Sequence, residues 1–147
     1  MEAIIARSDN FVIGYRGTIP WQCTEDLKFF KQFTMGKTLV VGRKTYMKLP
    51  TLPGRKLLVL TTDTTLRTIK ENVTFVTDVS LIPNDVVICG GYEIYELFQD
   101  KIDKLIVSVI HQNVKGDTVF NKAWLTRYKS AKIVHASKQC TITEYSL

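Results

Sequence analysis

Short apolar runs rich in β-branched residues recur along the chain and predict strands. The runs that are continuous rather than alternating are typical of strands covered on both faces; they are Ala3–Ala6, Thr38–Val41, Leu57–Leu60, Val73–Val76, Val86–Cys89 and Leu105–Ile110. The later segments 131–135 and 140–146 alternate more strictly between apolar and polar residues. These segments predict an antiparallel hairpin at one edge of a sheet.

Helical patterns lie between the apolar runs. The segment 24–33 predicts a helix with Thr24 as its N-cap. Glu25 and Asp26 fall in its first turn, where the helix dipole favours negative charge. The helix therefore has both the cap and the charge distribution expected at an N-terminus.

Shorter helices are expected to start near Lys44 and to cover 92–98, after Gly91. The alternation of strand and helix predicts an α/β fold with a mostly parallel sheet. In such sheets ligands bind beyond the carboxyl ends of the strands, where the following helices begin. Candidate chemistry is therefore sought at those ends.

Composition and charge narrow the class of protein. The chain has 147 residues, of which 45% are hydrophobic and 23% charged, so we expect one globular domain over 1–147. The net charge is +6, no apolar run approaches the roughly 18 residues of a membrane span, and Glu2 and Arg7 interrupt any signal-peptide pattern. Cys23, Cys89 and Cys140 are far apart in the sequence, and no two of them have the close spacing that zinc sites use. This favours a reduced, cytoplasmic protein without a zinc site.

Asp26 is the strongest single candidate for chemistry. In the predicted helix it shares a face with Phe29, Phe30 and Phe33, so a carboxylate lies on an otherwise apolar stripe. It could simply stabilise the helix dipole. Alternatively, it is a partly desolvated acid in a cleft beside Leu27, able to bind a flat heterocycle and support its protonation.

Glycines follow two of the predicted strands. Gly42 with Arg43, Lys44 and Thr45 combines close backbone approach, a helix start and cations, which is the chemistry of an anion site. Gly90-Gly91 repeats the strand–glycine–helix arrangement but does not form the GxGxxG fingerprint. Either segment could also be a solvated turn.

Other polar and aromatic residues have less specific signals. Arg55 follows the Pro53-Gly54 turn and could pair with a carboxylate or remain solvated, and Trp21 is either a core anchor or a wall beside Asp26. His111 and His135 have no partner at a spacing that suggests a catalytic triad or a metal site.

The order of these segments resembles the dihydrofolate reductase family. The resemblance runs from about Ala3 to Phe120 and rests on Ile13-Gly14, Ile19-Pro20-Trp21, Asp26-Leu27 with Phe30-Lys31, Gly42-Arg43-Lys44-Thr45, Leu52-Pro53-Gly54-Arg55-Lys56, Gly90-Gly91 with Ile94-Tyr95, and Gly116-Asp117-Thr118. It implies a twisted, mostly parallel eight-stranded sheet with an antiparallel final strand and about four helices. The implied reaction is NADPH-dependent reduction of 7,8-dihydrofolate to tetrahydrofolate.

The resemblance also implies roles for individual residues. The catalytic group would be Asp26, Trp21, Ser108 and Tyr95, with Ser108 in place of the family's usual threonine. The substrate would contact Ile4, Ile5, Leu27, Phe30, Lys31, Leu49, Leu52 and Arg55, where Arg55 clasps the glutamate tail. The cofactor would contact Ala6, Ile13, Gly14, Ile19, Gly42, Arg43, Lys44, Thr45, Thr61, Thr62, Gly90, Gly91, Glu93, Ile94 and Tyr95.

In this family Gly90-Gly91 would be a cis peptide, 14–21 a mobile loop and 116–118 the segment that latches it. We expect NADPH and dihydrofolate as partners, no metal, no nucleic acid, no membrane and a monomer in the cytoplasm, or in a host's cytoplasm if a virus encodes it. Two alternatives stay open. One is a riboflavin-pathway type of pyrimidine reductase on the same fold, and the other is a non-catalytic structural or nucleic-acid-binding relative, suggested by the positive charge.

Overall fold

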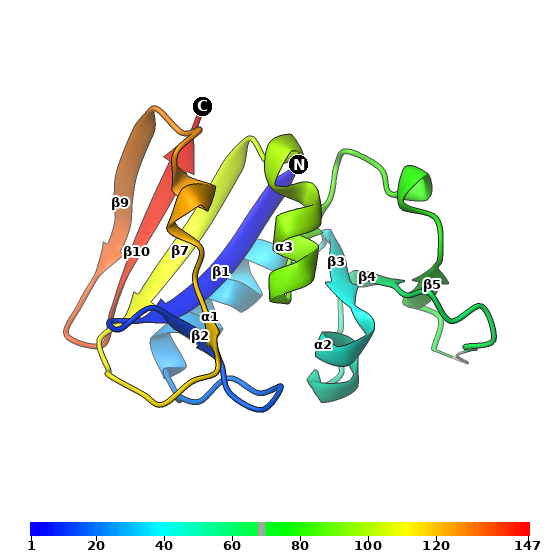
Figure 1. Cartoon of the computed structure of the whole chain (residues 1–147), viewed down its shortest axis with the longest axis horizontal. Coiled ribbons are helices and arrows are strands. Elements are labelled where there is room, and N and C mark those ends of the chain that lie inside the picture. The colour runs from blue at the N-terminus through cyan, green and yellow to red at the C-terminus, as the bar shows by residue number, and fades with distance from the viewer. Residues whose placement is uncertain (68–69) are drawn as a thin grey trace.

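A single twisted sheet forms the centre of the molecule (Figure 1). The computed structural model describes residues 1–67 and 70–147. In chain order the strands of this sheet are β1 (Glu2–Ser8), β3 (Thr38–Gly42), β4 (Lys56–Leu60), β5 (Val73–Val76), β6 (Val87–Ile88), β7 (Lys104–Ile110), β9 (Ser130–Ala136) and β10 (Cys140–Ser146). Every run predicted as a strand, the C-terminal hairpin included, contributes to one of them.

The order of the eight strands across the sheet is β5-β4-β3-β6-β1-β7-β10-β9. All adjacent pairs are parallel except the two made by β10, which runs antiparallel to both β7 and β9. The predicted mostly parallel sheet with an antiparallel final strand is thus confirmed. A small sheet of β2 (Val12–Gly14) and β8 (Thr118–Val119) was not predicted from the sequence.

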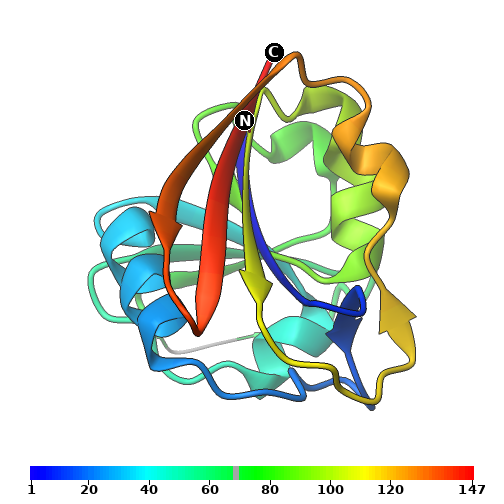
Figure 2. The same ribbon diagram turned by 90° about the vertical axis from the view of Figure 1, so that its left-hand side faces the viewer.

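Helices cover both faces of the sheet. The described residues form three α-helices, α1 (Thr24–Thr34), α2 (Arg43–Lys48) and α3 (Tyr92–Phe98), and the short 3₁₀ segments Val79–Leu81, Gln99–Lys101 and Lys122–Leu125. Figure 2 shows α1 and α3 on opposite sides of the sheet. The N-cap of α1 is Cys23 rather than Thr24, and no side chain caps this end. In the described parts of the chain, no helix is long and apolar enough to cross a membrane.

Alternation along β1 divides the core in two. Ala3 and Ile5 point into a cluster with Tyr95 and Phe98, which we call the α3-side core. Ile4 points the other way, into the α1-side core, which also contains Leu39, Val41, Val59, Ile106 and Ile142 and packs against Phe29, Phe30 and Phe33 of α1. The continuous apolar runs are explained by this arrangement, because each central strand is covered on both faces.

Candidate active site

Asp26 occupies the first turn of α1, half-buried, as the sequence predicted. Burial raises the pKa of its carboxyl group above the ordinary value, and the nearby Ser108 hydroxyl opposes the shift by lowering that pKa. Ser108 lies in β7 and is fully buried, and its Oγ makes no hydrogen bond of standard geometry to any described residue. A carboxyl group and a hydroxyl therefore lie close together where β7 passes the first turn of α1.

The edge of β1 beyond Ala3 is open toward β6. The strand β6 ends at Ile88, which pairs with Ala3, so among the described residues no strand pairs with the main chain of β1 on this side from Ile4 onward. The Tyr95 hydroxyl donates a 2.7 Å hydrogen bond to the Ile4 carbonyl oxygen. Burial, with smaller effects of Cys89 and Asp26, raises the pKa of Tyr95 well above its ordinary value, so the phenol remains a donor at neutral pH.

Glycines lie at the carboxyl ends of β3 and β6. The Gly42 N–H donates to the Gly90 carbonyl over 2.9 Å, and the Gly90-Gly91 peptide is cis, as the resemblance implied. A Cβ at Gly91 would lie 3.3 Å from Thr45 Oγ1, and one at Gly42 would lie 3.1 Å from Ile94 Cγ1. The starts of α2 and α3 are thus packed together with no room for further side-chain atoms.

Cationic and hydroxyl side chains flank this glycine backbone. Arg43 and Lys44 are exposed at the start of α2, while Thr62 is exposed and Thr61 buried just after β4. Hydrogen bonds from Thr65 are the main cause of the lowered pKa of Asp63, and the positive charge of Arg43 lowers it further. The ends of β3 and β4 are therefore close enough to interact. Glu93, also in the predicted cofactor set, is exposed in the first turn of α3.

Four of the eight predicted substrate-contact residues, Ile4, Phe30, Leu49 and Leu52, belong to the α1-side core or pack against it. Ile4 is buried there, and the partly buried residues packed against it include Ala6, Trp21, Phe30, Leu49 and Leu52. Ile5 instead faces the α3-side core. Leu27 is 66% exposed, and Lys31, one turn later on α1, is exposed as well. Leu27 and Lys31 thus face solvent on α1, next to the half-buried acid.

Arg55 is buried although it carries a full charge. Only 6% of it is exposed, its Nε donates to the Pro53 carbonyl over 3.1 Å, and its Nη1 donates to Thr34 Oγ1 over 3.3 Å. Thr34 in turn donates to the Phe30 carbonyl over 2.7 Å. The guanidinium is therefore held in a fixed orientation against the end of α1, and its remaining N–H groups can meet a carboxylate.

A cavity of about 240 Å³ adjoins this region. Leu49 and Leu52 line it together with Tyr46, Leu57 and Val73, but Asp26 does not. The cavity is therefore a neighbour of the leucines predicted to contact the substrate, and it does not contain the acid.

The segment that follows β2 is hydrogen-bonded to Asp117, just before β8. The Asp117 carboxylate accepts a hydrogen bond from the Arg16 main-chain N–H over 2.9 Å, which lowers the pKa of Asp117. Asp117 N–H donates to the Gly14 carbonyl over 3.1 Å. The contact expected between 14–21 and 116–118 is present. Ile13 packs against the α3-side core, and Ile19 is 62% exposed.

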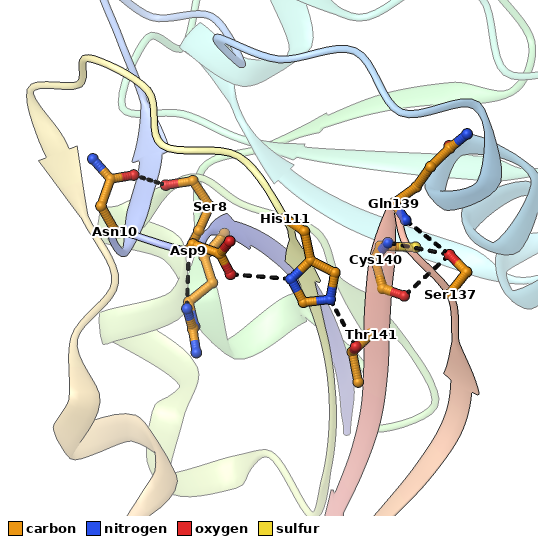
Figure 3. Close-up of polar contacts among 9 residues, drawn as sticks. Ser8, Asp9, Asn10, His111, Ser137, Gln139, Cys140 and Thr141 are labelled. Carbon is orange, nitrogen blue, oxygen red and sulfur yellow. Dashed lines mark hydrogen bonds and ion pairs between the residues drawn. The ribbon is translucent and has the colours of Figure 1, made fainter.

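Both histidines have partners that sequence spacing did not indicate. Figure 3 shows His111 between Asp9 and Thr141, with 3.1 Å from Nδ1 to Asp9 Oδ1 and 2.9 Å from Nε2 to Thr141 Oγ1. His135 Nε2 lies 3.5 Å from Glu25 Oε2. These partners, Asp9, Thr141 and Glu25, are far from the histidines in the chain, so no local motif could have revealed them.

Comparisons with known proteins agree with this arrangement. A sequence model described as dihydrofolate reductase matches residues 1–146. A dihydrofolate reductase of Staphylococcus aureus is 35% identical over 82% of this chain and 77% of its own, and one of Buchnera aphidicola is 34% identical over 90% and 86%. A solved dihydrofolate reductase from Enterococcus faecalis, complexed with NADP(H) and RAB-propyl, superposes with a TM-score of 0.82 at 28% identity, over 99% of this chain and 94% of that one. Because the family model spans residues 1–146 and these relatives are 34% and 35% identical over most of their length, this chain belongs to the dihydrofolate reductase family.

Proposed function

We propose that this protein catalyses the NADPH-dependent reduction of 7,8-dihydrofolate to 5,6,7,8-tetrahydrofolate, with Asp26 as the acid that supports protonation of the substrate. The observation that carries the proposal is the position of Asp26, half-buried in the first turn of α1 with its pKa raised by burial. Family membership and the NADP(H) complex of the Enterococcus relative support the same reaction.

The acid and its neighbours suit a planar substrate with hydrogen-bond donors along one edge. A pterin amide and amino group would donate to the Asp26 carboxylate, while the Ser108 hydroxyl, which lacks a hydrogen bond of standard geometry within the described residues, would accept or donate beside it. Trp21 and Phe30 supply apolar walls that limit water around the ring. A carboxyl group with a raised pKa keeps a proton available closer to neutral pH than an ordinary aspartate does.

The residues around Gly90-Gly91 fit a dinucleotide phosphate cofactor. The glycines let the starts of α2 and α3 pack closely at the ends of β3 and β6, and Arg43, Lys44 and Thr45 provide cationic and hydroxyl groups there for phosphate oxygens. When bound, NADPH supplies the hydride that reduces the carbon next to the protonated imine nitrogen. We assign Arg43 and Thr62 to the ribose 2′-phosphate, since the ends of β3 and β4 adjoin there.

Arg55 favours a folate over a ribosylated pyrimidine as substrate. Its guanidinium is buried and oriented by Pro53 and Thr34, close to Phe30 on the proposed wall of the substrate cleft. A fixed guanidinium of this kind binds a carboxylate through two parallel hydrogen bonds, and dihydrofolate presents the glutamate carboxylates to it.

We further propose that the protein is a cytoplasmic monomer that binds no nucleic acid. The described structure contains three free cysteines, Cys23, Cys89 and Cys140, in keeping with a reducing compartment. The net charge of +6 suits an anionic substrate and an anionic cofactor, so a nucleic-acid partner is not needed to explain this charge.

The test is a spectrophotometric assay of NADPH oxidation with dihydrofolate, alongside one with a ribosylated pyrimidine. We expect dihydrofolate-dependent turnover that a diaminopyrimidine antifolate blocks. Turnover of the pyrimidine alone would overturn the substrate assignment. NADPH binding without turnover of either, accompanied by a salt-sensitive DNA band shift, would overturn the enzymatic proposal.

A further inference from the structure

A thiol, an imidazole and a carboxylate meet where α1 contacts the C-terminal hairpin. Their donor atoms, one each from Glu25, His135 and Cys140, all lie within 4.8 Å of one another. Glu25 Oε2 is 3.5 Å from His135 Nε2 and 3.8 Å from Cys140 Sγ. These residues come from the first turn of α1 and from the two strands β9 and β10, so the cluster exists only in the folded chain.

The hairpin register brings these side chains to the same face. His135 pairs with Ile142, which points into the α1-side core, and the register shifts by one residue just beyond this pair. Cys140, two residues before Ile142 on β10, points to the same side and is fully buried. Directly paired residues lie on the same face of a sheet, so His135 faces α1 and Glu25 as Ile142 does.

The donor set has the chemistry of a zinc site. Zn²⁺ is bound by cysteine sulfur, histidine nitrogen and carboxylate oxygen, usually in a tetrahedral arrangement. His135 Nε2 is shielded from solvent and lies 3.5 Å from Glu25 Oε2, the same oxygen that Cys140 Sγ approaches at 3.8 Å. A nitrogen, a sulfur and an oxygen therefore converge on one point, as the ligands of a zinc ion do.

We propose that Glu25, His135 and Cys140 bind one Zn²⁺ ion, with water as the fourth ligand. Binding breaks the S–H bond of Cys140, whose proton passes to the buffer, and uses the neutral form of His135. The ion can enter from solvent, because the side chains of His135 and Glu25 are 38% and 35% exposed.

Neighbouring residues hold the ligands of this site in place. The Ser137 hydroxyl donates a hydrogen bond to the Glu25 carboxylate, fixing one ligand from the hairpin turn. Figure 3 shows Ser137 at this turn, where its hydroxyl also accepts from the main-chain N–H groups of Gln139 and Cys140. The nearby Cys23 thiol donates to Gln139 Oε1 over 3.7 Å, so we leave it outside the ligand set.

The experiment is calorimetric titration of reduced, chelator-treated protein with Zn²⁺, and titration with Co²⁺ followed by absorbance. We expect one ion per chain with a Kd of about 1 μM or tighter. We also expect release of a proton, and a Co²⁺–thiolate charge-transfer band. Cys140→Ser should abolish the band, and Cys140→Ser and His135→Gln should each weaken Zn²⁺ binding by at least about 10-fold.

The matched controls are Cys89→Ser and His111→Gln, which remove a thiol and an imidazole outside the cluster and should retain full binding. Absence of stoichiometric binding in the unsubstituted protein, or binding that survives Cys140→Ser, would overturn the proposal. The readouts are binding and absorbance rather than turnover, so they are independent of the proposed reductase activity.

Discussion

The Tyr95 hydroxyl and the Ile4 carbonyl oxygen are joined by a 2.7 Å hydrogen bond across 91 positions of sequence. The bond falls where β6 has ended and β1 pairs only with β7, so a side chain of α3 takes the place of a strand partner on the β6 side. Tyr95 is also the ring that a Cβ on Gly90 would approach, at 3.3 Å from its hydroxyl. One phenol thus links the open edge of β1 to the proposed cofactor site.

Tyr95→Phe should therefore affect both stability and catalysis. The buried Ile4 carbonyl would lose its donor, which costs about 1–3 kcal/mol of unfolding free energy. We expect kcat/KM for dihydrofolate to fall by about 10-fold as the edge of β1 loses its fixed position. Urea denaturation and steady-state kinetics measure the two effects.

Tyr128→Phe is the matched control, because the Tyr128 hydroxyl donates to the Ile102 carbonyl over 3.1 Å away from the site. It should lose stability while keeping kcat/KM. Equal kinetic losses in the two variants would show that Tyr95 acts through stability alone.

Asp26→Asn should abolish most activity while stabilising the protein at neutral pH. Burial raises the pKa of Asp26 in the folded state, so between the ordinary value and the raised one the native protein binds more protons than the unfolded chain. Stability from this group is therefore greatest at low pH and is lost as the pH rises through the folded pKa. Asparagine removes that penalty, so the gain in urea midpoint over the unsubstituted protein should grow as the pH rises above the ordinary pKa of an aspartate and level off above the raised pKa of the folded state.

Turnover of Asp26→Asn near pH 7 should fall by about 10²-fold or more, with NADPH affinity retained and residual activity rising as the pH decreases. Chelator in all buffers keeps metal ions from the adjacent Glu25. Asp78→Asn is the control, an exposed acid that caps a distant 3₁₀ segment and has a lowered pKa. Full activity in Asp26→Asn would remove the assigned role.

The sequence predicted the strands closely because each central strand is apolar on both faces. A short, continuous apolar run is typical of a buried strand. The segment Leu105–Ile110, for example, became all but the first residue of β7. The β2–β8 pair escaped prediction because it is short, and its register depends on a contact between residues over 100 positions apart. Cys23 took the place of Thr24 as N-cap because element boundaries depend on tertiary context.

The site residues show the same difference between local signals and signals that depend on tertiary structure. Asp26 could be selected because a carboxylate interrupts an apolar helix stripe, a signal contained within the predicted helix 24–33. The grouping of Glu25, His135 and Cys140 could not, since it depends on the register shift in the hairpin and on where α1 packs. Local pattern thus finds the single unusual residue, whereas clusters from several elements need the fold.

Gly90→Ala should destabilise the protein and weaken NADPH binding. Gly90 has a φ of +117°, outside the range that alanine adopts readily, and the new Cβ would meet the Tyr95 ring at 3.3–3.5 Å. We expect a loss of about 1–3 kcal/mol in unfolding free energy. Gly36→Ala is the control, since Gly36 has a φ of +77° but open space around it. A loss in Gly90→Ala no larger than in Gly36→Ala, with NADPH affinity unchanged, would contradict a crowded cofactor site.

Arg55→Lys should raise the KM for dihydrofolate by about 10-fold or more, because lysine cannot form two parallel hydrogen bonds with a carboxylate. The KM for NADPH and the kcat should change little, since Arg55 lies at the far end of α1 from Asp26. A dihydropterin substrate without the glutamate tail provides the decisive comparison. It should be reduced equally well by both proteins, while Arg127→Lys, a substitution at an arginine bound to the Gln99 carbonyl, should leave both substrates unaffected. If Arg55→Lys impaired the two substrates equally, the guanidinium would be supporting the packing of α1 through Thr34 rather than binding the glutamate tail.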